Sequence, residues 1–154
     1  MSYKTVRATP TITAGAYSAG DAVGGKMEFR DVCSPYKNTA AIVQAHIKDN
    51  AKQNAKLWLV LFDRDFTATA DNAAFTISDA DLLNVVMALE FAVADYVSFA
   101  NNSIALMDPA NYYILHPFEL VEGGTSLFGQ LFVETSTPTY VATNDLRVEL
   151  LIKT

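Results

Sequence analysis

The C-terminal segment alternates between apolar and polar positions over eight residues. One face receives four apolar side chains, namely Leu146, Val148, Leu150 and Ile152. The other face receives a mostly polar set, namely Arg147, Glu149, Leu151 and Lys153. Successive side chains of a β-strand point to opposite faces of its sheet. The pattern therefore predicts a strand with one buried face and one mostly solvated face.

Shorter patterns of the same kind recur along the chain. They predict strands over residues 5–13, 26–30, 41–48, 57–62, 103–107, 112–120 and 127–135. Pro10 lacks an amide hydrogen, so it confines the first strand to a sheet edge or interrupts it. Residues 57–62 are apolar on both faces, which predicts a central strand covered on both sides, or covered on one side by a partner.

Residues 78–93 fit both a helix and a strand. Ser78 followed by Asp81 resembles a helix N-cap, so we predict a short helical turn and then a strand from about Val85. Four glycines between residues 15 and 25 predict loops between early strands. Eight or nine short strands at this spacing predict an all-β fold. We expect residues 1–154 to form a single-domain, antiparallel, jelly-roll-like β-sandwich with at most one short helix.

Composition leaves two interpretations open. Charged residues make up 18% of the 154, against about 25% in typical soluble domains. Either the domain buries large contacts with other subunits, or neutral Thr, Ser and Asn cover its outer faces. The net charge of −6 argues against binding to a nucleic-acid backbone. The longest uncharged apolar run, residues 85–89, is too short to cross a membrane.

Candidate catalytic chemistry is sparse. Cys33 is the only cysteine and is predicted to be structural, and neither His46 nor His116 has a partner at metal-ligand spacing. Five loop carboxylates could ligate Ca²⁺, but the spacing of a calcium-binding loop is absent, so we interpret them as solvated and capping residues: Asp63, Asp65, Asp71, Asp79 and Asp81. We predict no enzyme activity, cofactor or metal.

Three stretches together resemble a known family. They are the Ala-Tyr-Ser-Ala-Gly-Asp-Ala-Val-Gly-Gly run at residues 16–25, and residues 61–82 and 125–148. The chain, from about Thr9 to Ile152, is similar to small virion structural proteins encoded by tailed phages. The resemblance implies a capsid decoration (cement) protein on the outer face of the head, assembled in the host cytoplasm, with the major capsid protein as partner. It supplies no catalytic residues.

Phage-shell symmetry and the doubly apolar strand suggest a homotrimer. The residues expected at its contacts are Trp58, Val60, Phe62, Tyr36 and Tyr140. Two other functions stay open. One is a neck, tail or head-fibre component of the virion. The other is a glycan-binding β-sandwich, in which exposed aromatic side chains stack on sugars: Tyr36, Tyr112, Tyr113 or Tyr140.

Overall fold

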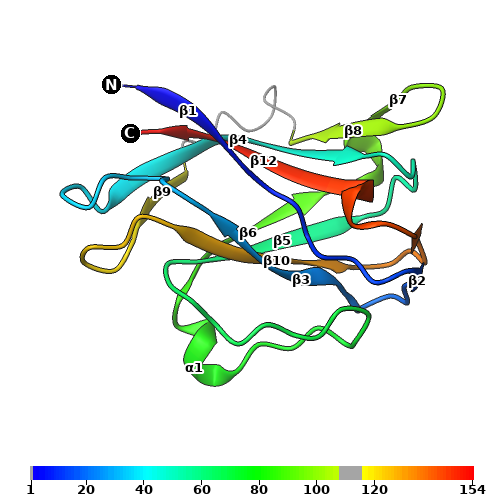
Figure 1. Ribbon diagram of the computed structural model, residues 1–154, viewed down its shortest axis with the longest axis horizontal. Helices are drawn as coiled ribbons and strands as arrows, with labels where there is room; N and C mark the ends of the chain where they lie inside the picture. The colour runs from blue at the N-terminus through cyan, green and yellow to red at the C-terminus, as the bar shows by residue number, and fades with distance from the viewer. Residues whose placement is uncertain (1, 108–115) are drawn as a thin grey trace.

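Two antiparallel sheets pack face to face in the computed structural model, which describes residues 2–107 and 116–154 (Figure 1). The larger sheet runs in the order β1 (Tyr3–Ala8), β12 (Leu146–Lys153), β4 (Thr39–Asp49), β8 (Ser103–Leu106) and β7 (Tyr96–Ser98), and β9 (His116–Glu119) also pairs with β4. The smaller sheet runs β3 (Ala22–Phe29), β10 (Leu127–Val133), β5 (Leu57–Phe62) and β6 (Val85–Phe91). The all-β sandwich is thus confirmed.

Short elements complete the described chain. The strands β2 (Gly15–Ala16) and β11 (Thr139–Tyr140) form a two-stranded sheet. One α-helix, α1 (Asp79–Leu82), and two 3₁₀ turns, η1 (Val93–Asp95) and η2 (Thr143–Asp145), make up the helical part. No helix among the described residues is long and apolar enough to cross a membrane. The strand order does not by itself establish jelly-roll wrapping, which stays a prediction.

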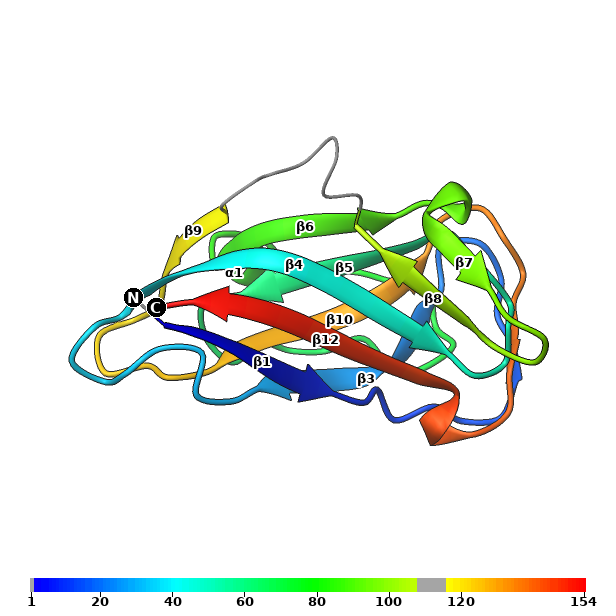
Figure 2. The ribbon, with the colours of Figure 1, turned by 90° about the horizontal axis from the view of Figure 1, so that it is seen from above.

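The core lies between the two sheets. All four apolar residues predicted for the inner face of β12 are fully buried, as are Leu57, Leu59 and Leu61 of β5. In the larger sheet, β12 lies between β1 and β4, so the first and last strands of the chain are neighbours (Figure 2). The inward-facing half of each alternating pattern is therefore what holds the sandwich together.

The second apolar face of β5 is covered by the chain itself. Val60 and Phe62 point away from the main core into a second cluster formed with the connection from β5 to β6. Phe66 stacks on Phe62 with 3.8 Å between ring centroids, and Phe75 stacks on Phe132 of β10 at 4.7 Å. In Figure 1 this connection and α1 lie beneath the smaller sheet. Of the two explanations for the doubly apolar strand, coverage within the chain is the one observed.

Some predicted element boundaries agree with the structure, and others differ from it. Ser78 Oγ accepts a hydrogen bond from the Asp81 amide at 3.1 Å, so the predicted N-cap is confirmed, and β6 begins at Val85 as expected. The first strand ends at Ala8, ahead of Pro10, and β3 begins at Ala22, inside the glycine-rich segment. The strands β2, β7 and β11 were not predicted, because two or three residues are too few to show alternation. Of the predicted strand 112–120, residues 116–119 form β9, and residues 112–115 lie outside the described residues.

Candidate interaction surface

The outer faces of the two sheets differ in what they expose. The connection from β5 to β6 covers part of the smaller sheet, as described above. The outer face of the larger sheet exposes apolar residues at one side, where Val97 of β7 is 52% exposed and its cross-strand neighbour Ile104 of β8 is half-buried. Phe99, in the turn from β7 to β8, is 55% exposed. This side of the larger sheet is the first part of the candidate surface.

A cluster of charges occupies the centre of the same face. Glu149 of β12 is only 6% exposed, and its Oε1 accepts from Arg7 Nε at 3.1 Å and from Lys48 Nζ at 2.8 Å. Arg147 Nη2 forms an ion pair with the same oxygen at 2.9 Å. The strand register creates this cluster, since Arg7 of β1 and His46 of β4 both lie opposite Glu149. Burial raises the pKa of Glu149, but the hydrogen bonds from Lys48 and Arg7 and the nearby cations outweigh burial and lower it. Three cations on one carboxylate leave a local positive surplus on an acidic protein.

His46 lies beside the charge cluster. The side chain is half-buried, and its Nε2 is buried with no hydrogen-bond partner among the described residues. Burial lowers the pKa of His46, although the charge of Glu149 acts in the opposite direction. His46 therefore lies on the outer face of its sheet, as the alternation in β4 predicts, but it is less exposed than a surface group.

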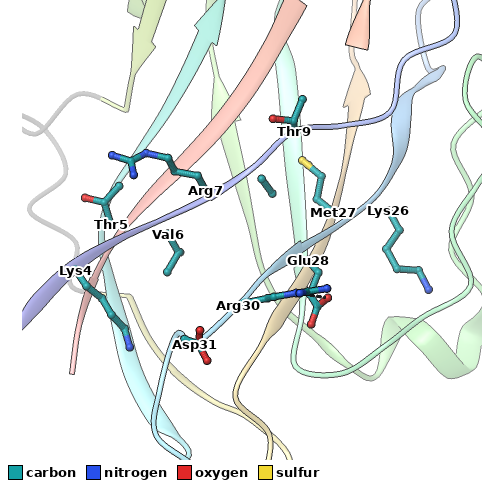
Figure 3. Close-up of a pocket in the computed structure, with 11 residues that line it drawn as sticks. Lys4, Thr5, Val6, Arg7, Thr9, Lys26, Met27, Glu28, Arg30 and Asp31 are labelled. Atoms are coloured by element: carbon teal, nitrogen blue, oxygen red, sulfur yellow. Dashed lines mark hydrogen bonds and ion pairs between the residues drawn. The ribbon is translucent and has the colours of Figure 1, made fainter. Parts of the chain in front are cut away.

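A groove of about 560 Å³ runs between the edge strands of the two sheets (Figure 3). Residues 4–9, in and after β1, line one side, and residues 26–28, 30 and 31, in and after β3, line the other. Buried side chains of Val6 and Met27 contribute its apolar lining. Four cationic side chains and two carboxylates also line it: Lys4, Arg7, Lys26, Arg30, Glu28 and Asp31.

The groove cations differ in how far they are neutralised. Arg30 Nε donates to Glu28 Oε2 at 2.9 Å, Lys26 pairs with Asp65, and Arg7 pairs with Glu149. Lys4 has no ion-pair partner among the described residues. Asp31 carries the opposite charge, so with Asp65 and Glu149 counted the four cations of the groove face four carboxylates, and the groove is close to charge-balanced.

The structure separates the five residues predicted for subunit contacts. Tyr36 is 96% exposed in the loop between β3 and β4. Trp58 is half-buried, and its Nε1 donates to Glu134 Oε2 at 2.9 Å. Val60 and Phe62 lie beneath the β5–β6 connection, and Tyr140 is fully buried, edge-on to Tyr17 at 5.8 Å. Only Tyr36 and part of Trp58 are therefore available to a partner in this conformation.

The same burial bears on sugar binding. Tyr140 cannot stack on a sugar without unfolding, and Tyr112 and Tyr113 lie outside the described residues. Of the four tyrosines considered for that role, Tyr36 alone is shown at the surface.

Four of the five loop carboxylates have structural partners, and Asp79 is exposed in the first turn of α1. Asp63 binds Arg64, Asp65 binds Lys26, and Asp71 accepts hydrogen bonds from four donor groups. Asp81 takes part in the cap of α1. Within residues 2–107 and 116–154, no group of three or more His, Cys, Asp or Glu side chains is placed to hold a metal ion. Cys33 is buried, in line with the structural role predicted for it.

Sequence reasoning missed the charge cluster around Glu149 and the groove between β1 and β3. The alternation in β12 assigned Arg147 and Glu149 to one face, but it carried no information about which strands lie on either side. Arg7, Lys48 and Arg147 come together only through the pairing of β1, β12 and β4. The groove likewise needs β1 and β3, which belong to different sheets.

Comparison with known proteins adds no assignment. The chain matches no protein-family model, and the search of curated proteins finds no significant match.

Proposed function

We propose that this chain is a structural protein of a tailed-phage virion, a capsid decoration protein bound to the outer face of the head. In this role it stabilises contacts between subunits of the major capsid protein. Two things support the proposal: the resemblance over residues 16–25, 61–82 and 125–148, and a β-sandwich whose larger sheet offers apolar and cationic groups on one outer face.

The outer face of the larger sheet is the observation on which the proposal depends most. Exposed apolar residues around Val97 lie on the same face as the Glu149 cluster. Apolar area supplies affinity in a protein interface, and charged groups at its rim supply orientation. A decoration protein needs both, because each copy must attach in one defined orientation on a repeating lattice. Copies at local threefold positions would form the proposed homotrimer.

A charge placed on this face tests the proposal. Val97→Glu puts a carboxylate on an exposed position of β7, so it should leave the fold intact while weakening a contact made there. The matched control is Leu83→Glu, since Leu83 is 86% exposed at the C-terminal end of α1, beneath the other sheet (Figure 1). We expect purified particles to lose the Val97→Glu protein and retain the Leu83→Glu protein, as measured by mass spectrometry of particle composition. Both variants should melt within a few degrees of the wild type in isolation.

Particles that lack the protein provide the second readout. They should assemble, but they should release DNA at a lower temperature or under milder osmotic shock than wild-type particles. The cement role is contradicted if particles without the protein release DNA under the same conditions as wild-type particles and if Val97→Glu also binds particles at full occupancy. The copy number per particle then distinguishes a location on the head from one on the neck, tail or fibre. A shell protein is present in hundreds of copies, and a neck, tail or fibre protein in far fewer.

A further inference from the structure

The outer face of the larger sheet is divided into two halves of different chemistry. One row of cross-strand neighbours runs over four strands: Arg147 of β12, Lys48 of β4, Ile104 of β8 and Val97 of β7 (Figure 2). Strands lie about 4.8 Å apart, so about 14 Å separates the two ends of this row. We call Arg7, Lys48 and Arg147 the cationic half of the face, and Val97, Phe99 and Ile104 the apolar half.

Positive charge exceeds negative charge on the strands of this face. Side chains alternate between the faces of a strand, and the inward half of each pattern is buried, so the outward half is defined. Among the described residues, four cations and two carboxylates point outward from the sheet: Arg7, Lys48, Arg147, Lys153, Glu119 and Glu149. Glu119 lies opposite Thr39, at the other end of β4 from Lys48, so it leaves the charges around Glu149 unchanged.

The cationic half is itself unbalanced. Its three side chains share the single carboxylate of Glu149 and are still 58%, 39% and 45% exposed for Arg7, Lys48 and Arg147. The whole chain has 11 Lys and Arg against 17 Asp and Glu, so the cationic half is opposite in sign to the molecule that carries it. Such a region orients the molecule as it approaches a partner and favours a partner surface of negative charge.

The apolar half indicates that this partner is a protein. Val97 and Phe99 are about half exposed, and protein interfaces combine an apolar centre with charged groups at the rim. A nucleic-acid backbone would leave the apolar half unused and requires a more basic face. A second copy bound through the same face is a poor occupant. It would oppose the two cationic halves or bury the cations of each copy against the apolar half of the other.

We infer that the outer face of the larger sheet binds a protein surface on which carboxylates lie beside an apolar patch. The carboxylates face the cationic half, and the apolar patch covers Val97 and Phe99. The inference rests on the proposed function, in which this surface belongs to the major capsid protein, and it adds the chemistry by which the partner is recognised.

The isolated protein tests the cationic half, with poly-L-glutamate as the probe. In an NMR titration at about 20 mM salt, where the screening length is about 20 Å, we expect shifts in the amide signals of β12 and β4 around Glu149. Arg147→Gln should weaken this binding at least about threefold. It leaves Arg7 and Lys48 on Glu149, so the fold should be retained. The matched control is Arg64→Gln, because Arg64 is 49% exposed and pairs with Asp63.

Particles prepared without the protein test the whole face. The affinity of added wild-type protein should fall at least about tenfold between about 50 and about 500 mM NaCl. Arg147→Gln should bind more weakly and depend less on salt, whereas Arg64→Gln should behave as the wild type does.

The outcomes separate this inference from the proposed function. The inference is wrong if poly-L-glutamate shifts no signals on this face, if Arg147→Gln and Arg64→Gln behave alike, or if a DNA duplex binds the face at about 150 mM salt. Particle binding that is independent of salt and of Arg147 contradicts the inference and leaves the decoration role intact. Absence of wild-type binding to particles contradicts the decoration role, and the poly-L-glutamate titration still decides the charge preference of the face.

Discussion

At the scale of single residues, Asp71 joins segments that are far apart in the chain. Its Oδ2 accepts from the amide and the hydroxyl of Thr13, each at 2.6 Å. Its Oδ1 accepts from the Gly24 amide at 2.6 Å and from the Tyr17 hydroxyl at 2.9 Å. Burial raises the pKa of Asp71, but these hydrogen bonds together outweigh burial and lower it. The ionised carboxylate thus ties the β5–β6 connection to the N-terminal segment.

Asp71→Asn should therefore destabilise the fold in a pH-dependent way. An amide offers one acceptor oxygen to the same donors, and we expect the free energy of unfolding at pH 7 to fall by about 2 kcal/mol. A carboxyl whose pKa is lowered by folding stabilises the native state above its unfolded pKa of about 3.9 and loses this effect as the pH falls through the folded value. The difference in unfolding free energy between Asp71→Asn and the wild type should therefore become smaller only below about pH 4.

Urea denaturation at pH 7 and pH 3 measures both effects. Asp79→Asn is the control, because Asp79 is exposed in the first turn of α1. A difference between Asp71→Asn and wild type that is equal at the two pH values would contradict the assigned role of Asp71.

Gly24 and Gly20 provide a matched pair for backbone strain. Both adopt positive φ, at 74° and 92°. A Cβ on Gly24 would lie 2.4 Å from Cβ of Pro10, whereas a Cβ on Gly20 would meet nothing within 4 Å. Gly20→Ala should cost about 1 kcal/mol for its backbone conformation alone. Gly24→Ala should cost about 1–3 kcal/mol more, because the clash forces the segment of Pro10 away from β3. If Gly20→Ala and Gly24→Ala have equal midpoints in thermal unfolding, the close approach of Pro10 to Gly24 contributes nothing to stability.

At the scale of elements, the β5–β6 connection acts as the cover of the smaller sheet. Phe66 is 6% exposed and stacks on Phe62, so Phe66→Ala removes the ring that shields β5. We expect a loss of about 3 kcal/mol in unfolding free energy and increased binding of a hydrophobic dye. Phe99→Ala is the control. Phe99 is 55% exposed, so removing its ring should change the unfolding free energy little. A dye signal that is unchanged in Phe66→Ala would mean that other residues cover Phe62.

At the scale of the whole molecule, the order of the strands predicts slow folding. β1 pairs with β12 over Tyr3 to Ala8, which joins the two ends of the chain, and β3 pairs with β10 across a further long separation. Contacts between residues distant in sequence carry a large loop-closure cost before they form. Refolding by stopped-flow fluorescence of Trp58 should therefore take milliseconds to seconds, as in other sandwiches. Refolding within microseconds would contradict this.

Local pattern alone determined much of this protein. The inner face of β12, the double apolar character of β5, the cap of α1 and the start of β6 at Val85 all follow from alternation or from residue chemistry within a few positions. Such signals survive folding because a strand or a cap uses groups that are adjacent in the chain.

Tertiary structure decided what covers each face and which charges meet. The second face of β5 is covered by Phe66 of the β5–β6 connection, and Tyr140, predicted at a subunit contact, lies in the core. Glu149 met Arg7 and Lys48 from strands more than a hundred positions away in the chain. An alternating pattern states that one face of a strand is to be buried, but it does not state which segment will bury it. That choice depends on pairing between distant strands, and so does the groove between β1 and β3.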